Sequence, residues 1–326
     1  VANGMVTGFT VITSQKYGAK LKDETRRTVA NGIILSCIVV LVLTVLSLSF
    51  MRSILNIMNT PADIYEDAYS YISVICKGIV ALVFYNLFSA FLRAVGNSRI
   101  PLYTLIFSAL LNIVLDLVFI VNFHMGVAGA AWATNISQGI SAVLCLVYII
   151  RREPVLTPSS KMWKLNREYT NKQLYIGVPM ALQFGITASG TMIMQSAINI
   201  YGSTAVAGFT AAGKVQNLLT QGMFSIGQTM TSYSGQNFGK GDLDRVESGV
   251  KDAMKIMVVY SLVAAVIAFF ALPYIMRLFF AQDVDLTELL PWAKTYITEC
   301  IVAYIPLAAI FIFRNSKIRI RYFYLV

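Results

Sequence analysis

The sequence predicts an all-α polytopic membrane protein made of two pseudo-symmetric helical lobes. Its composition is 57% hydrophobic and only 13% charged, and its mean hydropathy is +0.67; soluble domains do not have this balance. The apolar residues gather in runs long enough to cross the ~30 Å hydrocarbon core of a bilayer. In addition, several short sequences of the first half return in the second half at nearly constant separation.

The apolar runs predict about eight full spans plus an N-terminal partial helix. Residues 1–14 are apolar but too short to span, so we expect the chain to open inside a helix. Val29–Phe50 contains no charged residue and is a complete span. The remaining spans are expected at residues 68–92, 100–123, 127–150, 174–201, 204–238, 256–280 and 289–313. The span at 204–238 is rich in Ser, Thr, Gln and Gly, as expected if one side lines a water-filled cavity.

Lys and Arg are distributed unequally between alternate loops, and this predicts the orientation of the chain. Most of the 26 basic residues fall in loops at 15–28, 93–99, 151–172 and 235–252. By the positive-inside rule these loops are cytoplasmic, and the chain is a multi-pass protein of the cell membrane. Topology therefore accounts for the net charge of +10, and we expect no nucleic-acid partner.

An internal repeat predicts the two lobes. The sequence QKYG at 15–18 recurs as QNFG at 236–239, MR at 51–52 recurs at 276–277, and YI at 71–72 recurs at 296–297, with separations of 221, 225 and 225. Both copies have the same orientation, so an axis along the membrane normal relates them. We expect an N-terminal lobe at 1–151, a cytoplasmic linker at 152–172 and a C-terminal lobe at 173–326.

Asp116 is an ionisable residue inside an apolar span, where its charge costs several kcal/mol and indicates a functional site. Asn112 is one helical turn earlier, on the same face. The turn to the next helix is centred near His124, so Thr134 reaches a similar depth, roughly 12–15 Å from that turn at ~1.5 Å per residue. The three side chains are therefore expected to converge.

The trio Asn112, Asp116 and Thr134 suits two different cations. Burial favours the protonated form of a carboxylate, which could carry a proton across the membrane. Carboxylate, amide and hydroxyl oxygens are also hard ligands that could hold Na⁺. A structural aspartate bonded to neighbouring helices is the third interpretation. The sequence does not choose among them.

Two later helices carry polar stripes that predict a substrate cavity. The first recurs every four residues and the second at intervals of three and four, so each stripe follows one helix face. Polar contacts between packed helices are the alternative, but such contacts need fewer groups. The cavity candidates are Gln183, Thr187, Thr191, Gln195, Lys214, Asn217, Gln221 and Gln228.

The sequence contains no pattern typical of a soluble enzyme. It has no Ser-His-Asp, HExxH, Walker or GxGxxG arrangement, and its four cysteines form no CxxC pair. We therefore expect a transporter rather than an enzyme. It should need no cofactor beyond a coupling ion, Na⁺ or H⁺, and no metal beyond Na⁺ at Asp116. The expected partners are a small-molecule substrate and membrane lipid, and the expected state is a monomer.

Several motifs resemble those of the multidrug and toxic compound extrusion (MATE) transporters. The chain has RAVGNS at 93–98 with Pro101, NIVLD at 112–116 and GVAGAAWAT at 126–134, similar to the family's RAxGxxxxP loop, NxxxD helix and GxxGAAxAT helix. GVP at 177–179 and GQNFG at 235–239 look like second-half counterparts. The resemblance covers nearly the whole chain. It implies the MOP-superfamily architecture, with this chain running from the end of the second helix to the tenth.

The resemblance also implies a function. It indicates a secondary active antiporter that exports amphipathic or cationic drugs or metabolites in exchange for Na⁺ or H⁺ by alternating access. The family's first-lobe cation site matches at Asn112, Asp116 and Thr134. A lipid-linked oligosaccharide flippase of related architecture is the alternative, but it should carry several cavity arginines, and Lys77 and Lys214 are the only cations that we expect to be buried.

The chain departs from the family pattern in two ways. The family also uses an aspartate on its first helix, which this chain lacks. The pattern further predicts a helix and a half before Val1 and two helices after the tenth, whereas the end of the chain reads SKIRIRYFYLV at 316–326. We therefore expect this chain to be a form that is incomplete at both ends and has a truncated basic tail. We also expect this form to have reduced activity or none.

Overall fold

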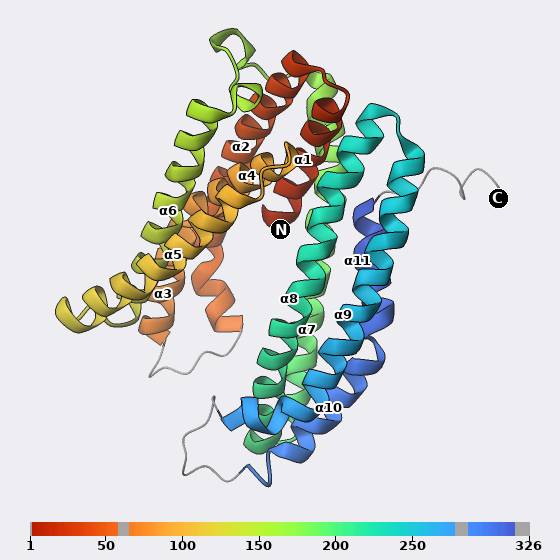
Figure 1. Ribbon diagram of the computed structural model, residues 1–326. Coiled ribbons are helices and arrows are strands. Elements are labelled where there is room, and N and C mark those ends of the chain that lie inside the picture. Colours follow the sequence, from red (N-terminus) through yellow and green to blue (C-terminus); the bar gives the residue numbers. More distant parts are fainter. Residues whose placement is uncertain (1, 58–64, 278–285, 317–326) are drawn as a thin grey trace. The chain divides into compact units, whose positions relative to one another are not determined.

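The computed structural model describes residues 2–57, 65–277 and 286–316, and over these residues it is helical without strands (Figure 1). The predicted all-α fold is therefore confirmed. The chain divides into two compact units, Val1–Phe184 (unit 1) and Gly185–Val326 (unit 2). The basic tail after residue 316 and the segments 58–64 and 278–285 lie outside the described residues.

Unit 1 is built around the apolar faces of α4 and α6. Its helices are α1 (Ala2–Gly18), α2 (Lys22–Ile57), α3 (Tyr65–Lys77), α4 (Ile79–Ala94), α5 (Arg99–Leu117), α6 (Gly126–Arg152) and the first half of α7 (Arg167–Asn199). A π-helix, η1 (Val118–Asn122), extends α5, and two short 3₁₀ helices, η2 (Pro154–Leu156) and η3 (Ser160–Met162), follow α6. Leu87 and Phe91 of α4 pack with Cys145 of α6 and Val29 of α2 in one buried cluster.

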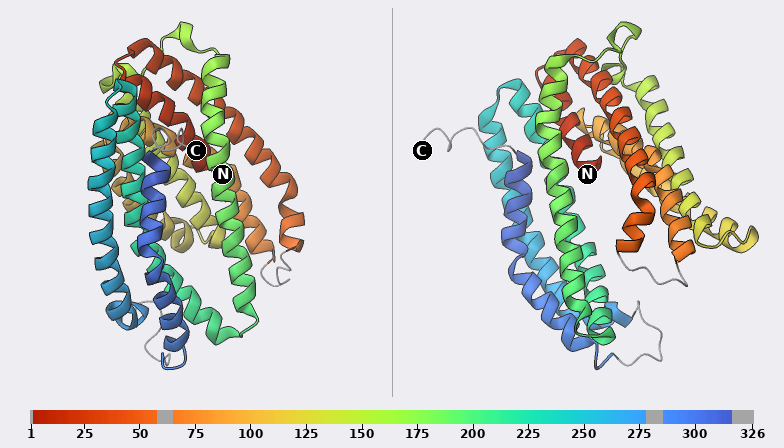
Figure 2. Two further views of the ribbon diagram at one scale, coloured as in Figure 1. Left: turned by 90° about the vertical axis from the view of Figure 1, so that its right-hand side faces the viewer. Right: turned by 180° about the vertical axis from the view of Figure 1, so that it is seen from behind.

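Unit 2 contains the second half of α7, then α8 (Ser203–Lys240), α9 (Leu243–Arg277), α10 (Leu290–Val302) and α11 (Tyr304–Ser316). The long helices α8 and α9 lie side by side, and α10 and α11 run along them in succession (Figure 2). Met223 of α8, Met257 of α9 and Ile312 of α11 are fully buried where these three helices meet. Apolar burial therefore holds this unit together independently of unit 1.

The helices agree with most of the predicted spans. Five described helices are long and apolar enough to cross a bilayer individually, or up to seven when each of two bent helix pairs forms one span. α8 is longer than any of these five helices, but its polar composition makes it less apolar than they are. The eighth span, which α8 would supply, therefore stays a prediction.

Two predicted spans are broken, each near its middle. α3 and α4 meet at 42° and α10 and α11 at 49°. At the first break, a β-carbon on Gly78 would overlap the Asn135 side chain of α6, and Asn135 Nδ2 donates to the Val74 carbonyl at 2.6 Å. At the second break, Pro306 lacks the N–H that would bond to the Val302 carbonyl. Both breaks thus have a local chemical cause.

The element boundaries repeat at the separations found in the sequence. α2 begins at Lys22 and α9 at Leu243, which are 221 positions apart, whereas α3 begins at Tyr65 and α10 at Leu290, which are 225 apart. The break at Gly78 also has its counterpart 225 positions later, at Ala303. The internal repeat therefore extends to the bend within a span.

The three basic loops of unit 1 lie at the same end of that unit. Arg26 Nε, after the α1–α2 turn, donates to the Pro154 carbonyl at 2.9 Å, and Asn97 of the α4–α5 turn donates to Glu153 at 3.2 Å. These contacts agree with placing the three loops on one side of the membrane. The two units divide inside α7, at Phe184, rather than at the polar segment 152–172, and the lobe boundaries drawn from the sequence stay predictions.

Candidate cation site and polar helix faces

The predicted cation-site residues lie on an antiparallel hairpin formed by α5 and α6. The hairpin turns at Phe123–Met125, and His124 occupies that turn with a φ of 51°. Ser141 of α6 donates to the Thr104 carbonyl of α5 at 3.2 Å, and the Thr104 hydroxyl lies 3.4 Å from Cys145 Sγ. These contacts fix which turns of the two helices face each other.

This register brings Asn112 and Thr134 to the same level. Thr104 of α5 faces residues 141–145 of α6. Asn112 lies eight residues after Thr104, and the helices are antiparallel, so it faces residues eight positions earlier on α6. These are residues 133–137, which include Thr134. Asp116 is one turn closer to the hairpin end. Near the hairpin end, Gly129 of α6 faces Phe119, because a β-carbon on Gly129 would lie 3.0 Å from Phe119 Cβ. This contact agrees with the same register. Thr134 therefore lies level with Asn112 and about a turn from Asp116.

Asn112 and Asp116 each have a buried polar atom without a partner. Asn112 Nδ2 and Asp116 Oδ1 are shielded from solvent and form no hydrogen bond, and among the described residues Asp116 forms no ion pair. Leaving a buried donor or acceptor unmet costs about 1–3 kcal/mol, more for a charged group. The Thr134 hydroxyl donates to the Ala130 carbonyl at 3.1 Å, and its oxygen lone pairs can still accept. That the three side chains together hold a small cation or a proton stays a prediction.

The backbone changes its winding immediately after Asp116. α5 ends at Leu117 and the next five residues, Val118–Asn122, form the π-helix η1. Such π-helical turns are rare and frequently occur at functional sites. Wider winding shifts the residues beyond Asp116 around the axis relative to a continuous α-helix, although Phe119 of η1 still faces Gly129 of α6. No pattern in the sequence predicts this change of winding.

The stripe on α7 crosses from unit 1 into unit 2. Gln183 is half-buried in unit 1, whereas Thr187 and Thr191 are exposed on the part of α7 that belongs to unit 2. Gln195 is half-buried and donates to Asn199 at 3.1 Å, so the stripe partly satisfies itself along the helix.

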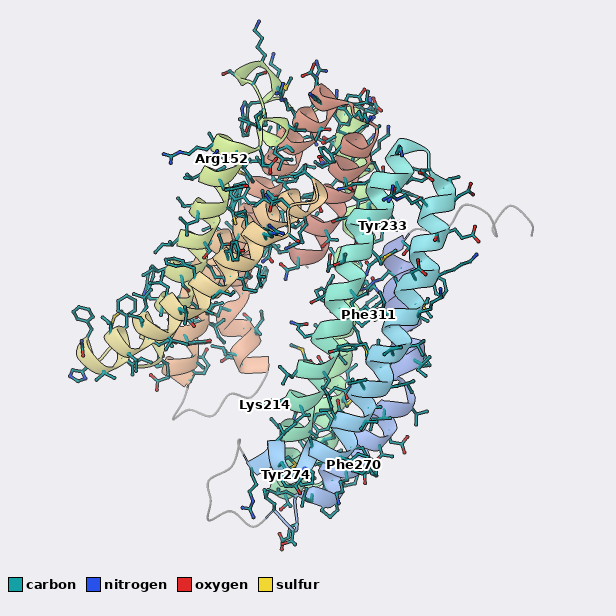
Figure 3. The ribbon with its side chains drawn as sticks, in the orientation of Figure 1. Arg152, Lys214, Tyr233, Phe270, Tyr274 and Phe311 are labelled. Carbon is teal, nitrogen blue, oxygen red and sulfur yellow. The ribbon has the colours of Figure 1, made fainter. Side chains whose placement is uncertain are left out.

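The stripe on α8 lies on the face that does not pack within unit 2. Lys214, Asn217 and Gln221 are exposed, and Gln228 is half-buried. Lys214 extends from α8 on the side away from α9 and α11 (Figure 3). The opposite face buries Val215 and Met223 against the other helices of the unit. The role of the α8 stripe as a cavity lining stays a prediction.

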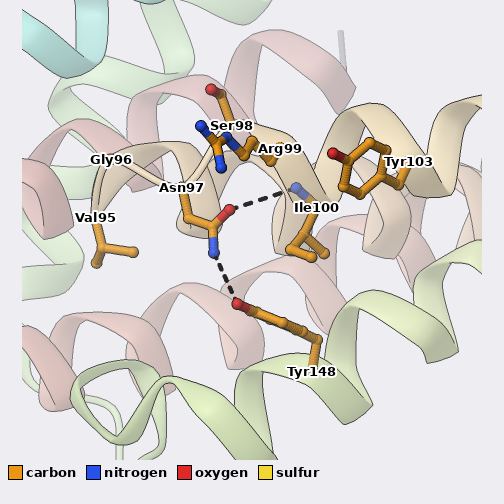
Figure 4. Close-up of a pocket in the computed structure, with 8 residues that line it drawn as sticks. All are labelled: Val95, Gly96, Asn97, Ser98, Arg99, Ile100, Tyr103 and Tyr148. Carbon is orange, nitrogen blue, oxygen red and sulfur yellow. Dashed lines mark hydrogen bonds between the residues drawn. The ribbon is translucent and has the colours of Figure 1, made fainter.

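A surface hollow of about 540 Å³ lies at the α4–α5 turn, within the RAVGNS sequence (Figure 4). Gly96 takes a φ of 90°, which glycine adopts without strain. Asn97 donates to the Tyr148 hydroxyl at 3.2 Å and accepts from the Ile100 amide at 3.4 Å. The Asn97 amide is thus used to tie the turn to α6 and to the start of α5. We assign this sequence a structural role.

Sequence reasoning missed a buried amide network that joins α7 to α1 and α2. Asn31 and Gln173 are both fully buried and bonded to each other at 2.8 Å. Gln173 Nε2 also donates to the carbonyls of Thr28 and Phe9, at 3.0 and 3.3 Å. The sequence places Gln173 at the end of a polar linker, where nothing indicates burial. The network makes the start of α7 part of unit 1.

The membrane-length helices define a polytopic membrane protein, and the unpartnered Asp116 oxygen inside an apolar span marks a candidate functional site. The family model MatE matches residues 1–118 and 179–316. The chain belongs to the MatE family. This membership and the spans place it in the cell membrane as a multi-pass protein, as predicted from the sequence.

Several curated proteins are similar to the chain. The probable multidrug resistance protein YpnP of Bacillus subtilis is 35% identical over 216 residues, which cover 64% of this chain and 48% of that protein. The multidrug export protein MepA of Staphylococcus aureus is 25% identical over 288 residues, covering 88% and 62%. The chain thus spans about half to three-fifths of the length of these relatives.

Solved structures show the same fold. An outward-facing multidrug resistance MATE family transporter of the MOP superfamily matches with a TM-score of 0.87 at 23% identity, covering 97% of this chain and 71% of that chain. A MOP-superfamily transporter from Pyrococcus furiosus matches with a TM-score of 0.85 at 22% identity, covering 97% and 72%. The predicted architecture is therefore confirmed. YpnP and MepA carry multidrug resistance or export names, whereas the binding pocket of the Pyrococcus furiosus transporter is described as suggesting a different function. None of these relatives favours the flippase alternative.

Proposed function

We propose that the protein is a secondary active antiporter that exports amphipathic or cationic small molecules in exchange for Na⁺ or H⁺. The observation that carries this proposal is the pair of unpartnered buried atoms, Asn112 Nδ2 and Asp116 Oδ1, within an apolar helix. A cation that enters and leaves would supply the missing interaction for part of each cycle. A purely structural aspartate would instead have a permanent partner.

The residues of this chain have distinct roles in the proposal. Asp116 holds the cation as a proton on its carboxylate or as Na⁺ between oxygens, and Asn112 and Thr134 supply the neighbouring oxygens. The stripes on α7 and α8 line the path of the substrate. Their side chains are uncharged except for Lys214, so they can form hydrogen bonds with chemically varied compounds. Na⁺ and H⁺ account for this geometry equally well. The experiment below distinguishes them.

Replacing Asp116 by Asn tests the proposal. The change keeps the shape of the side chain and removes its charge and its ability to take up a proton. In vesicles loaded with a fluorescent organic cation, we expect efflux driven by a Na⁺ or a pH gradient, applied separately, to fall at least about tenfold, because the loss of one charge-assisted interaction corresponds to that factor or more.

Asp252→Asn provides the matched control. Asp252 is an exposed residue of α9 paired with Lys255 at 3.0 Å, and exposed pairs contribute little to stability. This variant should transport at the rate of the unmodified protein. Gradient-driven efflux that survives in Asp116→Asn would show that another group carries the coupling ion.

A further inference from the structure

Gln138 has the third unpartnered atom on the α5–α6 seam. Among the described side chains of these two helices, the buried polar atoms without a hydrogen bond are Asn112 Nδ2, Asp116 Oδ1 and Gln138 Oε1. Gln138 lies four residues after Thr134 and three before Ser141, so it shares the face of α6 that meets α5. Three orphaned atoms along one helix contact call for a common explanation.

The register places Gln138 next to Asn112, on the side away from Asp116. Because Ser141 and Cys145 both face Thr104, Gln138 faces the turn of α5 at 107–111. Asn112 therefore lies between Gln138 on one side and Asp116 on the other. The unpartnered acceptor of Gln138 belongs to an uncharged amide, and that of Asp116 belongs to a carboxylate.

The chemistry of an asparagine amide makes this order meaningful. Its oxygen only accepts and its nitrogen only donates, and the two point in different directions from the same carbon. Bound Na⁺ and a protonated carboxyl both need an oxygen from Asn112, one as a ligand and the other as a hydrogen-bond acceptor. In either case the Asn112 oxygen turns toward Asp116, and its nitrogen turns toward Gln138. An ionised, cation-free Asp116 instead attracts the Asn112 nitrogen.

We propose that Gln138 is a positioning residue of the ion site, whose Oε1 accepts from Asn112 Nδ2 when the coupling ion is bound at Asp116. This inference rests on the antiport function proposed above. Gln138 stabilises the ion-bound orientation of the Asn112 amide without touching the ion. It therefore sets the affinity for the coupling ion, whichever ion that is, and leaves the substrate path unchanged.

The test measures ion dependence and substrate dependence separately. Gln138→Leu and the nearly isosteric Gln138→Met remove the amide acceptor. With the gradient that drives efflux in the unmodified protein, these two variants should need roughly tenfold more of the driving ion for half-maximal efflux, the factor that one ordinary hydrogen bond corresponds to.

The controls separate positioning from a structural role. Asn122→Leu, the same kind of change at an exposed residue of η1, should leave the ion dependence unaltered. The maximal rate and the half-saturating substrate concentration should change less than about twofold in both Gln138 variants. An unchanged ion dependence, or an equal loss in the maximal rate of both apolar variants, overturns the role of Gln138. Retained coupling in Asp116→Asn overturns the proposed function itself.

Discussion

Asn31 and Gln173 show how two side chains distant in sequence hold one helix in place. They are 142 positions apart and share a hydrogen bond at 2.8 Å. Asn31 Oδ1 also accepts from the Asn166 amide, at 2.9 Å. Each polar group therefore has partners, and the network is satisfied, unlike the three orphaned atoms on α5 and α6. Satisfied buried networks specify one arrangement, whereas we propose that the orphaned atoms on α5 and α6 serve a coupling ion.

Removing the Gln173 amide should destabilise the protein. In Gln173→Leu, Asn31 Nδ2 loses its bond at 2.8 Å and keeps the one to the Thr170 hydroxyl at 3.1 Å, and the carbonyls of Thr28 and Phe9 lose a donor. We expect the free energy of unfolding, measured by titration with a denaturing detergent, to fall by about 1–3 kcal/mol, because buried groups are left unmet. Asn171→Leu, two residues away and exposed, is the control. Equal stability of the two variants would contradict the role of the network.

The same residues show what the sequence could and could not predict. Asn112 and Asp116 stand out because they are polar within an apolar run, which needs no knowledge of tertiary structure. Gln138 and Gln173 do not stand out. Their importance depends on which helix lies opposite, and helical periodicity does not contain that information. The level of Thr134 was predicted to within about one turn, because a short hairpin forces the two helices to be antiparallel neighbours.

At the scale of the element, length was predictable, whereas the break between α3 and α4 was not. Apolar runs give the extent of the helices because the thickness of the bilayer sets it. A glycine such as Gly78 weakens a helix but does not by itself break it. The break involves Asn135, 57 positions later, whose side chain takes the place that a β-carbon at Gly78 would fill. It therefore depends on a neighbouring helix, unlike the α10–α11 break, which has Pro306 beside it.

The crossing of α1 and α7 depends on two glycines. A β-carbon on Gly8 would overlap the backbone of Gly177, and small residues of this kind allow helices in membranes to approach closely. Gly8→Ala should therefore push the helices apart and lower the free energy of unfolding by about 1–3 kcal/mol, as overpacking does. The effect can be measured in the same detergent titration.

Gly139→Ala is the control for this crossing. Its β-carbon would lie 3.7 Å from Ala81 Cβ, which is an ordinary contact. Because alanine favours helix more than glycine does, this variant should be unchanged or more stable by up to about 1 kcal/mol. If Gly8→Ala is as stable as Gly139→Ala, α1 and α7 do not pack at these glycines.

At the scale of the whole molecule, the internal repeat predicts the orientation of the second unit from that of the first. Helix starts and a helix break recur at separations of 221 and 225 positions, so Arg52 near the end of α2 corresponds to Arg277 at the end of α9. Both residues are exposed. If both copies have the same orientation, these arginines lie on one side of the membrane, and the basic loops lie on the other side in each unit.

Cysteine labelling tests this orientation. In a background without the four native cysteines, Arg52→Cys and Arg277→Cys should both react with an impermeant maleimide added outside intact cells, because the positive-inside rule places the basic loops in the cytoplasm. Lys161→Cys and Lys240→Cys, both exposed, should react only after the membrane is opened. If Arg52→Cys is labelled from outside and Arg277→Cys is not, the two copies of the repeat have opposite orientations. The helix breaks at Gly78 and Ala303 would then be oppositely oriented in the membrane.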